Sequence, residues 1–509
     1  MSLDRTIARY LKDKDADARE RLLSHLNSNR ISDEEWPLIP ELLAKSPSEK
    51  LRCYAWLSLR ANVKPSEELC SVLGLEMEQL MTLFACEIRR AFFPVVNSAG
   101  GSRLAELLIF TFDNPEPRAI AFGAWYSEKS GLLATLTGKS FLVVFSEDFE
   151  GDSWMCAAAA ALIRRSNDLL SELCFSGEVT AAGQINAAGL VEAKKLCCLN
   201  NAKRLVTAVD SLPALEFWLS AEALPIPVIQ CNGSNEKRSA WLAKLELAIK
   251  KEYPWFSLNA LWELTGLASD RLFIGEENEL PFDPKYWQGF LGRVNNFDLI
   301  DQAVSPRKVV FWYASMISSL QFGIGARFGF KRPVCICHWD SGGQEYIPVI
   351  KLYGGVNARV LKKVYLDPLE LTQISYEAYI PRRDVKDLAL VLYFGSHNPR
   401  QEAISHMREI SDDLGILFVQ LKKGQGQITF ESDWLRIVQE TNSLLNHLKQ
   451  LYHWNRTHIF QTSPNAICMA LGIALGHFVP ATVYHYQPQS STTSYQGMYE
   501  LEKSLRYGA

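Results

Sequence analysis

The stretch FGIGARFGFKRPVCICHWD, residues 322–340, has a second copy in this chain of 509 residues. It aligns without a gap with MALGIALGHFVPATVYHYQ, residues 469–487, so that Gly325 falls on Gly472 and His338 on His485, 147 positions later. Each copy follows a strand-like run and has the pattern of a long helix, a glycine and a strand that ends in histidine and an aromatic residue. The repeat therefore predicts two related α/β units in the C-terminal half.

Two related units favour a shared binding site. Doubly wound sheets bind ligands beyond the C-terminal ends of their strands, so a pseudo-symmetric pair suits a ligand that is itself nearly symmetric. Upstream, LFIGEEN (272–278) resembles LYFGSHN (392–398), which we interpret as the strand end and loop of each copy. The alternative interpretation is that the two copies pack together for stability alone.

Polar, basic and aromatic residues near the repeat are candidates for holding an anionic ligand. Small polar loops and helix N-termini hold phosphate, basic side chains add positive charge, and aromatic rings stack on bases. These rules select Trp312, Tyr313, Lys331, Arg332, Gly395, Ser396, His397, Asn398, His458, Ser463, Pro464 and Asn465. Glu276 and Glu277 stand in LFIGEEN where the other copy has Ser396 and His397, and they would repel phosphate if they pointed inward.

A second candidate site lies in FSGEVTAAGQINAAGLVEAKKL, residues 175–196, where Lys194 stands among small and apolar residues. Burial penalises an ammonium, so such a lysine has a lowered pKa and can act as a base toward serine. Ser153 begins an apolar helix 41 positions earlier, where N–H groups can hold an oxyanion. The alternative is structural: Lys194 would extend to solvent from a helix and Ser153 would be an N-cap.

The order and spacing of several residues around this pair resemble the Lon-type serine protease domain, over roughly residues 104–250. The matching positions are Gly151-Asp152-Ser153, Ser176-Gly177-Glu178, Gly183 and Lys194. The resemblance implies that Ser153 is the nucleophile, that Lys194 is the general base and that Ser176 orients the lysine. Trp154 and Met155 replace small residues of the family and could occlude the oxyanion site. The chain has no G-x-x-x-x-G-K-[ST] phosphate loop, so such a protease would cut accessible sites without unfolding its target.

The C-terminal half resembles the SAVED domain, a fused pair of CARF-like modules that binds cyclic oligonucleotides in prokaryotic antiviral systems. The resemblance rests on HIFQTSPNAICMALGIALG followed by ATVYHY (458–486), with LALVLYFGS before it, and covers roughly residues 260–505. A Lon-type domain joined to SAVED resembles the CRISPR-associated Lon proteases of type III systems. That likeness implies activation by cyclic tetra-adenylate (cA4), ligand-induced homo-oligomers and cleavage of a partner protein encoded next door.

Two alternatives remain open at this stage. SAVED effectors of CBASS-type systems respond to cyclic trinucleotides, so the ligand could be cyclic tri-adenylate (cA3). The Lon-like domain could also be inactive, in which case the protein would be a nucleotide-binding scaffold.

Composition sets the remaining expectations. A net charge of −4 with 22% charged residues gives no overall field that would gather polymeric nucleic acid or an acidic membrane. The charged N-terminus and the lack of a long apolar run predict a cytoplasmic protein without a membrane span. The eleven cysteines lack framework spacing, and we expect no metal or cofactor. We predict an α/β multidomain protein with a helical domain at 1–97, a Lon-like α+β protease domain at 98–250 and a SAVED domain of two Rossmann-type units at 251–509.

Overall fold

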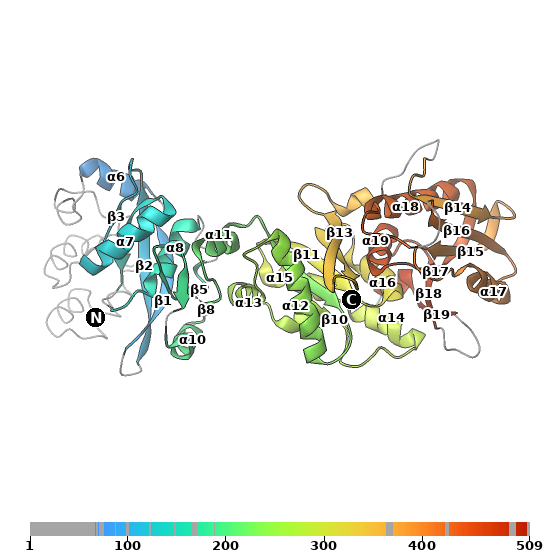
Figure 1. Ribbon diagram of the computed structural model, residues 1–509, viewed down its shortest axis with the longest axis horizontal. Helices are drawn as coiled ribbons and strands as arrows, with labels where there is room; N and C mark the ends of the chain where they lie inside the picture. Colours follow the sequence, from blue (N-terminus) through green and yellow to red (C-terminus); the bar gives the residue numbers. More distant parts are fainter. Residues whose placement is uncertain are drawn as a thin grey trace, which may run out of the picture. The chain divides into compact units, whose positions relative to one another are not determined.

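The computed structural model contains two compact units (Figure 1). The structure describes residues 67, 70, 76–86, 88–97, 101–121, 124–146, 149–164, 170–187, 189–362, 370–422, 427–487 and 495–505. The first unit comprises Met1–Ala221 and Asn259–Gly266, and the second comprises Glu222–Leu258 and Leu267–Ala509. The helices expected before residue 67 lie outside the described residues.

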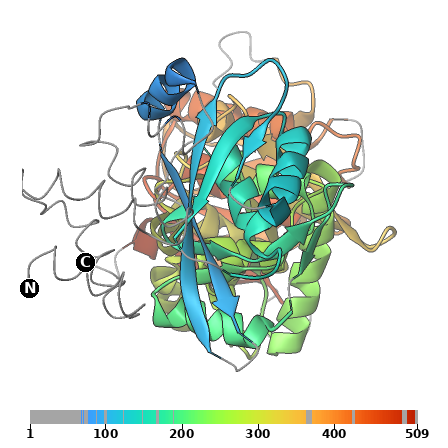
Figure 2. The same cartoon turned by 90° about the vertical axis from the view of Figure 1, so that its left-hand side faces the viewer.

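The first unit is built on a six-stranded sheet in the order β3-β4-β2-β1-β5-β8. Its strands are β1 (Arg89–Val96), β2 (Ser102–Phe112), β3 (Ala119–Ile120), β4 (Ser140–Phe145), β5 (Leu173–Phe175) and β8 (Arg204–Val206). The long hairpin of β1 and β2 is blue in Figure 2, and β4 pairs antiparallel with β2. All six residues of β4 are buried, which fits an apolar strand inside the sheet.

The helices of the first unit are α6 (Met77–Ala85), α7 (Ala124–Thr137), α8 (Trp154–Ile163), α10 (Val191–Asn200), α11 (Leu212–Ser220) and α13 (Leu258–Thr265). A two-stranded hairpin of β6 (Gly177–Val179) and β7 (Ile185–Ala187) completes it. Helix α8 confirms the apolar helix that we predicted after Ser153. Arg89 donates to the carbonyl oxygens of Ala161 and Leu162, a cation at the C-terminus of α8 that favours the helix dipole.

One sequence prediction about the first unit is wrong. Residues 89–96, which we assigned to a helical domain, form β1 because their aromatic and valine side chains suit a sheet. Asn97, which follows β1, donates its N–H to Gly101 O, and Gly101 N donates to Asn97 Oδ1. In α7, Leu133 and Ala134 are buried and Thr135 is exposed.

The second unit contains two sheets. The first half has the order β10-β9-β11-β12-β13 and the second half β14-β16-β15-β17-β18-β19. The first-half strands are β9 (Ala223–Gln230), β10 (Phe273–Ile274), β11 (Lys308–Ser315), β12 (Val334–Asp340) and β13 (Glu345–Leu352). The second-half strands are β14 (Ile374–Tyr379), β15 (Asp384–Tyr393), β16 (Leu414–Leu421), β17 (His453–Thr462), β18 (Ala481–Tyr486) and β19 (Tyr495–Glu500). Strands β10, β9, β11 and β12 of the first sheet run parallel, and β13 is antiparallel at one edge. Strands β16, β15, β17 and β18 of the second sheet run parallel, and β14 and β19 are antiparallel at its two edges.

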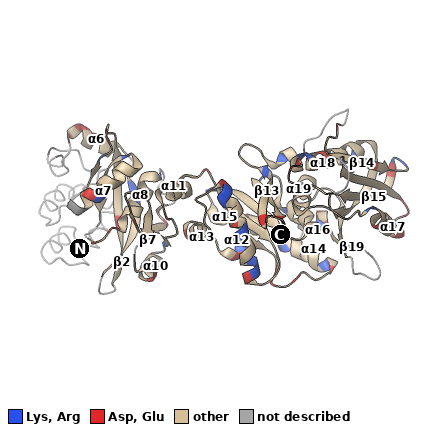
Figure 3. Cartoon of the chain, viewed as in Figure 1, with Lys and Arg blue, Asp and Glu red and all other residues tan. Residues whose placement is uncertain are grey.

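The domain boundary differs from our prediction at residue 250. The structure assigns β9 to the second unit because β9 pairs with β11 along its whole length. The α-helices of this unit are α12 (Asn235–Glu252), α14 (Pro284–Arg293), α15 (Asn296–Val304), α16 (Ser318–Phe328), α17 (Arg400–Ile410), α18 (Trp434–Leu451) and α19 (Asn465–Leu475). Figure 3 shows basic and acidic residues interspersed along the chain, with basic residues near both ends of α12.

The two halves of the second unit meet where α16 packs on α19. A Cβ atom on Gly325 would lie 2.3 Å from Met469 O, and one on Gly472 would lie 2.4 Å from Phe322 O. The backbones therefore approach too closely for any side chain at these two positions. The repeat paired the same two glycines, and the structure explains the match, because both lie at the crossing of the two helices.

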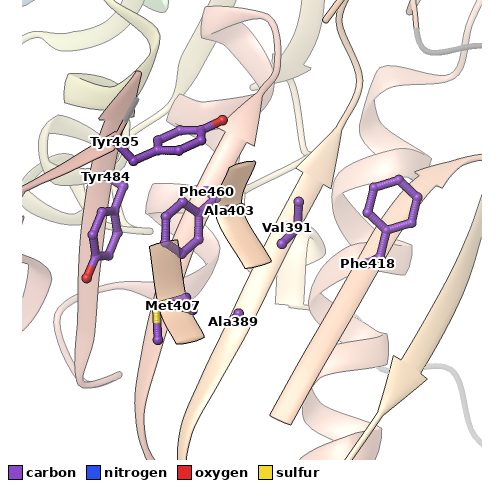
Figure 4. Packing of buried hydrophobic residues seen from close by; sticks show 8 residues of the cluster. All are labelled: Ala389, Val391, Ala403, Met407, Phe418, Phe460, Tyr484 and Tyr495. Atoms are coloured by element: carbon purple, nitrogen blue, oxygen red, sulfur yellow. The ribbon is translucent and has the colours of Figure 1, made fainter. Parts of the chain in front are cut away.

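A buried cluster fixes α17 on the second-half sheet (Figure 4). The ring of Phe460 in β17 stacks on that of Tyr484 in β18 with centroids 4.2 Å apart. Val391, Met407 and other apolar residues fill the space around this pair. Successive side chains of a strand alternate between faces, so the opposite face of β17 carries Thr457, Ile459 and Gln461 toward the other helices.

Within the residues that the structure describes, no helix is both long and apolar enough to cross a membrane.

Candidate functional site

Lys194 lies inside the first unit, on the inner side of α10. It is 6% exposed, and its Nζ donates a hydrogen bond of 3.0 Å to Ser176 Oγ. Burial lowers the pKa of Lys194 below its ordinary value, and Cys198 nearby opposes that change only in part. The side chain does not extend to solvent, so it differs from the surface lysine of the structural alternative.

Ser153 lies at the first turn of α8, close to the strand that follows Ser176. The N–H of Gly177 donates to the carbonyl oxygen of Ser153 at 3.1 Å. The backbones of Ser153 and Gly177 are therefore in contact, one residue from the hydroxyl that Lys194 binds. The Ser153 side chain forms no capping hydrogen bond, unlike a serine that serves only as an N-cap.

Lys129 of α7 joins the two segments that carry these serines. Its Nζ lies 3.1 Å from Asp152 Oδ2 and 3.0 Å from Glu178 Oε1. Asp152 precedes Ser153, and Glu178 follows Ser176 by two positions. Hydrogen bonds to both carboxylates raise the pKa of Lys129, so it stays charged while Lys194 is driven toward neutrality. The two lysines thus have opposite electrostatic environments.

Trp154 is part of the core of the first unit. Its fully buried side chain packs in an aromatic cluster with Tyr126, Phe145 and Phe149, at centroid distances of 6.1 Å from Tyr126 and 5.1 Å from Phe145. The Tyr126 hydroxyl donates to Phe149 O and so fixes the loop before the serine. The indole of Trp154 is thus a core side chain. Its position does not provide the occlusion of the oxyanion site that the sequence suggested.

A cleft of about 420 Å³ in the second unit gathers residues from both halves. Its lining comprises Ser318, His338, Phe394, Gly395, Ser396, His397, Gln427, Ile428, Gln461, Thr462, Ser463, Pro464, His485 and Tyr486. Five of the predicted ligand residues are among them: Gly395, Ser396, His397, Ser463 and Pro464. They follow the C-terminal ends of the parallel strands β15 and β17, as the fold rule predicts.

Hydrogen bonds across the cleft floor join the two halves. Gln461 Nε2 of the second half donates to Ser318 Oγ of the first half at 2.9 Å. Gln461 Oε1 accepts from Ser463 N of its own half at 2.7 Å, which fixes the amide. Asn465, a predicted ligand residue, donates its Nδ2 to Ser315 O at 2.6 Å, so its side chain joins the halves as well. The Ser463 hydroxyl is buried without a hydrogen-bond partner among the described residues.

Each histidine of the repeat reaches across to the opposite half. His485 of the second half packs against Phe282 and Trp287, while His338 of the first half packs against Phe430 and Trp434. Burial lowers the pKa of both imidazoles, so both are neutral at pH 7. Among the described residues that line the cleft, none is lysine or arginine. Helix dipoles, backbone N–H groups and neutral donors therefore supply what this cleft offers to an anion.

Other predicted ligand residues lie elsewhere. Trp312 and Tyr313 are fully buried in the strand β11 and offer no open ring face for stacking. Lys331 and Arg332 precede β12 and so lie at the opposite end of the strands from the cleft. Arg332 also pairs with Asp298 and Asp301.

His458 and Asn398 also lie outside the cleft lining. His458 is buried in β17, where Nε2 lies 3.0 Å from Asp387 Oδ1 and Nδ1 lies 3.0 Å from the Tyr484 hydroxyl. This network satisfies a buried polar cluster beneath α17. Asn398 accepts a hydrogen bond from Arg400 N at its Oδ1 and so shapes the turn before α17.

The pairing of LFIGEEN with LYFGSHN is corrected by the sheet order. Phe273 and Ile274 form β10, at the edge of the first sheet, whereas β15 lies next to β17 in the interior of the second. The first-half strand equivalent to β15 is β9, which lies next to β11. Glu276 therefore has no counterpart in Ser396, and it binds Tyr286 and Arg293 instead.

Sequence reasoning missed the first-half loop that corresponds to Gly395–Asn398. This loop is CNGSN, residues 231–235, which our predicted boundary at residue 250 placed in the protease domain. It follows β9 and opens α12, where Ser234 Oγ accepts from Lys237 N. A buried apolar strand, a small polar loop and a helix in succession are the signal that both loops share, and that signal could have found it.

The fold and the cleft define a class of protein with two doubly wound units that face each other across a candidate ligand site. Comparison with known families assigns the region more closely. Residues 297–500 match the family model for SAVED, the "SMODS-associated and fused to various effectors sensor domain". The chain therefore carries a SAVED domain in its C-terminal half, as the sequence predicted.

Solved structures of Cap4 receptors are similar to part of the chain. The Acinetobacter baumannii Cap4 SAVED/CARF-domain receptor with 3'3'3'-cAAA is 15% identical, with a TM-score of 0.31, over 43% of this chain and 44% of that one. The same receptor with 2'3'3'-cAAA is 12% identical, with a TM-score of 0.33, over 54% of this chain and 50% of that one. The Moraxella osloensis Cap4 SAVED/CARF-domain receptor is 14% identical, with a TM-score of 0.26, over 43% of each chain. The chain thus spans half or less of the length of these receptors, and no curated protein matches it.

Proposed function

We propose that the protein is a serine endopeptidase that is switched on when its SAVED domain binds a cyclic oligoadenylate. The observation that carries the peptidase part is the buried lysine hydrogen-bonded to Ser176, with the backbone of Ser153 against Gly177. The cleft beyond β15 and β17 supports the sensor part. The ligand we favour is cA4, with cA3 as the alternative suggested by the Cap4 receptors solved with cyclic trinucleotides.

The proposed chemistry uses groups of this chain alone. Neutral Lys194 takes the proton from Ser153 Oγ as that oxygen attacks the peptide carbonyl carbon. N–H groups at the start of α8 hold the oxyanion, and the Lys194 ammonium then gives its proton to the leaving amine. Water hydrolyses the resulting ester with Lys194 again as the base. Ser176 accepts a hydrogen bond from Lys194 and so fixes the direction of the amine.

The biological setting we propose is antiviral defence of the type III CRISPR or CBASS kind. Ligand-induced homo-oligomers and a partner protein cut at one site belong to this proposal. Energy coupling of this kind requires the ligand to bind the active arrangement more tightly than the resting one.

The test is labelling of the full chain with a fluorophosphonate probe, without ligand and with cA3 or cA4, and with Ser153→Ala as the site control. Labelling of Ser153 that increases with one ligand supports the proposal. Measured ligand binding without any Ser153 labelling would instead favour the scaffold with an inactive Lon-like domain. Intact-mass analysis of the neighbouring gene product, mixed with this protein and the same ligands, then tests cleavage at a single site.

Lys129→Met is expected to slow Ser153 labelling about 10- to 100-fold, because the loop and the strand that carry the serines lose their common cation. The measurement is the rate constant of labelling, not its amplitude. A merely structural loss would lower the amplitude, since fewer molecules would be folded. Lys195→Met is the control, because Lys195 is exposed and pairs only with Glu192 of its own helix. Equal rate constants for wild type and Lys129→Met would contradict the prediction.

Ser463→Ala is expected to weaken cyclic oligoadenylate binding about tenfold without lowering the melting temperature. The hydroxyl is buried at the cleft and has no hydrogen-bond partner to lose among the residues that the structure describes. Calorimetric titration and thermal unfolding measure the two effects. Ser411→Ala should behave in the opposite way, since Ser411 Oγ donates to Asp387 Oδ2 away from the cleft. Unchanged affinity in Ser463→Ala would remove this hydroxyl from the ligand site.

A further inference from the structure

A second cavity lies in the SAVED half, away from the cleft. Its volume is about 180 Å³, and it lies between the β15–β17 face of the sheet and the helices α18 and α19. The lining residues are Lys362, Leu390, Asn442, Leu445, Asn446, Lys449, Thr457, Ile459, Ala474, Leu475, Phe478 and Val479. None of them belongs to the cleft, although Ile459 and Gln461 lie on the same face of β17.

The inner wall of this cavity is apolar. Leu390 and Ile459 form its floor on the sheet, and Leu475 closes it from α19. Apolar cavities near 150 Å³ hold one aromatic ring in other proteins, so this volume suits a body of about six to eight carbon atoms. Phe478, which is 76% exposed, lines the cavity from the turn after α19 and adds apolar surface there.

A polar group inside the cavity lacks a partner. Asn442 is 4% exposed, and its Nδ2 is buried without a hydrogen bond among the described residues. An unpaired buried donor is costly to the folded state. A ligand oxygen placed against this amide would relieve that cost, so the donor points to an occupant with an acceptor rather than to a hydrocarbon.

Two lysines line the cavity together with this amide. Lys362 and Lys449 come from the 3-10 helix η2 (Ala358–Lys362) and from α18, and no aspartate or glutamate is among the described residues that line the cavity. Neither ammonium forms an ion pair with a carboxylate in the part of the chain that the structure describes, and each lies over an aromatic ring, Phe330 or Trp454. The charged side chains among the described lining residues are therefore both lysines.

We propose that this cavity is a second ligand site that binds a small amphipathic carboxylate, with a medium alkyl chain or one aryl ring as its apolar body. The carboxylate lies between Lys362 and Lys449, Asn442 donates to it, and the body packs on Leu390, Ile459 and Leu475. This site is separate from the proposed cyclic oligoadenylate site and does not depend on the proposed peptidase activity.

Isothermal titration of the full chain with sodium octanoate tests the site. We expect one site per chain with a Kd on the order of 0.1 mM, and binding at least about tenfold weaker for 1-octanol and for octylammonium, which lack the carboxylate. The double variant Lys362→Met with Lys449→Met should weaken octanoate about tenfold or more. Lys386→Met, an exposed lysine outside the cavity, is the control. Octanol that binds as tightly as octanoate, or the absence of saturable octanoate binding up to about 10 mM, would overturn the proposal.

Asn442→Leu separates a ligand role from a structural one. Leucine has nearly the same shape and removes the unpaired donor, so we expect a melting temperature equal to or above that of the wild type. Octanoate affinity should nevertheless fall about tenfold. Unchanged octanoate affinity together with unchanged stability would show that Asn442 does not face the ligand, and would count against the site.

Discussion

Lys194→Met is expected to reduce the rate of Ser153 labelling by about 10²- to 10⁴-fold, the contribution typical of a positioned general base. Methionine keeps most of the side-chain volume of lysine and removes the amine that bonds to Ser176. The measurement is the labelling rate constant with saturating cyclic oligoadenylate. Lys195→Met again provides the matched control, because Lys195 is the next residue on α10 but is exposed.

The pH dependence of the same rate constant gives the sign of the effect. Burial lowers the pKa of Lys194, and only the neutral amine can accept the proton of the serine. The rate should rise about tenfold for each pH unit below the pKa of the folded protein and level off at a pH below 10.5, the ordinary value for lysine. A plateau that begins only above 10.5 would show that Lys194 is not the base.

Stability should change with pH in a related way. The folded protein holds fewer protons than the unfolded chain between the lowered pKa of Lys194 and 10.5, so its stability increases with pH across that interval. Lys194→Met removes the buried ammonium at low pH but leaves Ser176 Oγ without this partner. The melting temperature of the wild type should therefore increase relative to that of Lys194→Met as the pH rises toward 10.5.

Some features of the sites could be predicted from the sequence because they depend on local order. The helix after Ser153 and the lysine among small residues are properties of single segments. In the structure Lys194 donates to Ser176 Oγ, and Gly177 N donates to Ser153 O. Gly325 and Gly472 were paired by the repeat before their contact was known, since only glycine fits at such a crossing.

The errors came from pairings that no single segment encodes. LFIGEEN looks like LYFGSHN in letters, yet the order of strands in the sheet makes β9 the counterpart of β15. Trp312 and Tyr313 lie in a strand buried on both faces, where a continuous apolar run gives no sign of which side chain faces a ligand. Arg332 forms ion pairs with Asp298 and Asp301, which lie three positions apart on α15. These carboxylates neutralise the positive charge that we had assigned to phosphate binding.

Gly472→Ala is expected to destabilise the second unit by about 1–3 kcal/mol, and by more if the helices cannot separate. The new methyl group would lie 2.4 Å from Phe322 O, a backbone atom that moves only if α16 moves with it. Ligand binding should weaken as well, because Ser318 begins α16, Asn465 begins α19, and the hydrogen bonds of both residues join the halves at the cleft. Chemical denaturation and calorimetric titration of cyclic oligoadenylate measure these two effects.

Gly289→Ala is the matched control for this prediction. Gly289 lies in α14 of the same unit, and a Cβ there would be 3.6 Å from the end of the Arg293 side chain, which is an ordinary contact. Alanine is the better helix former, so this variant should gain about 0.5–1 kcal/mol while Gly472→Ala loses stability. Since the substitution is identical, a difference of opposite sign can come only from the helix crossing. If both variants instead gain stability, α16 and α19 do not cross as closely as the structure shows. That result would contradict the helix packing that brings the two halves together at the cleft.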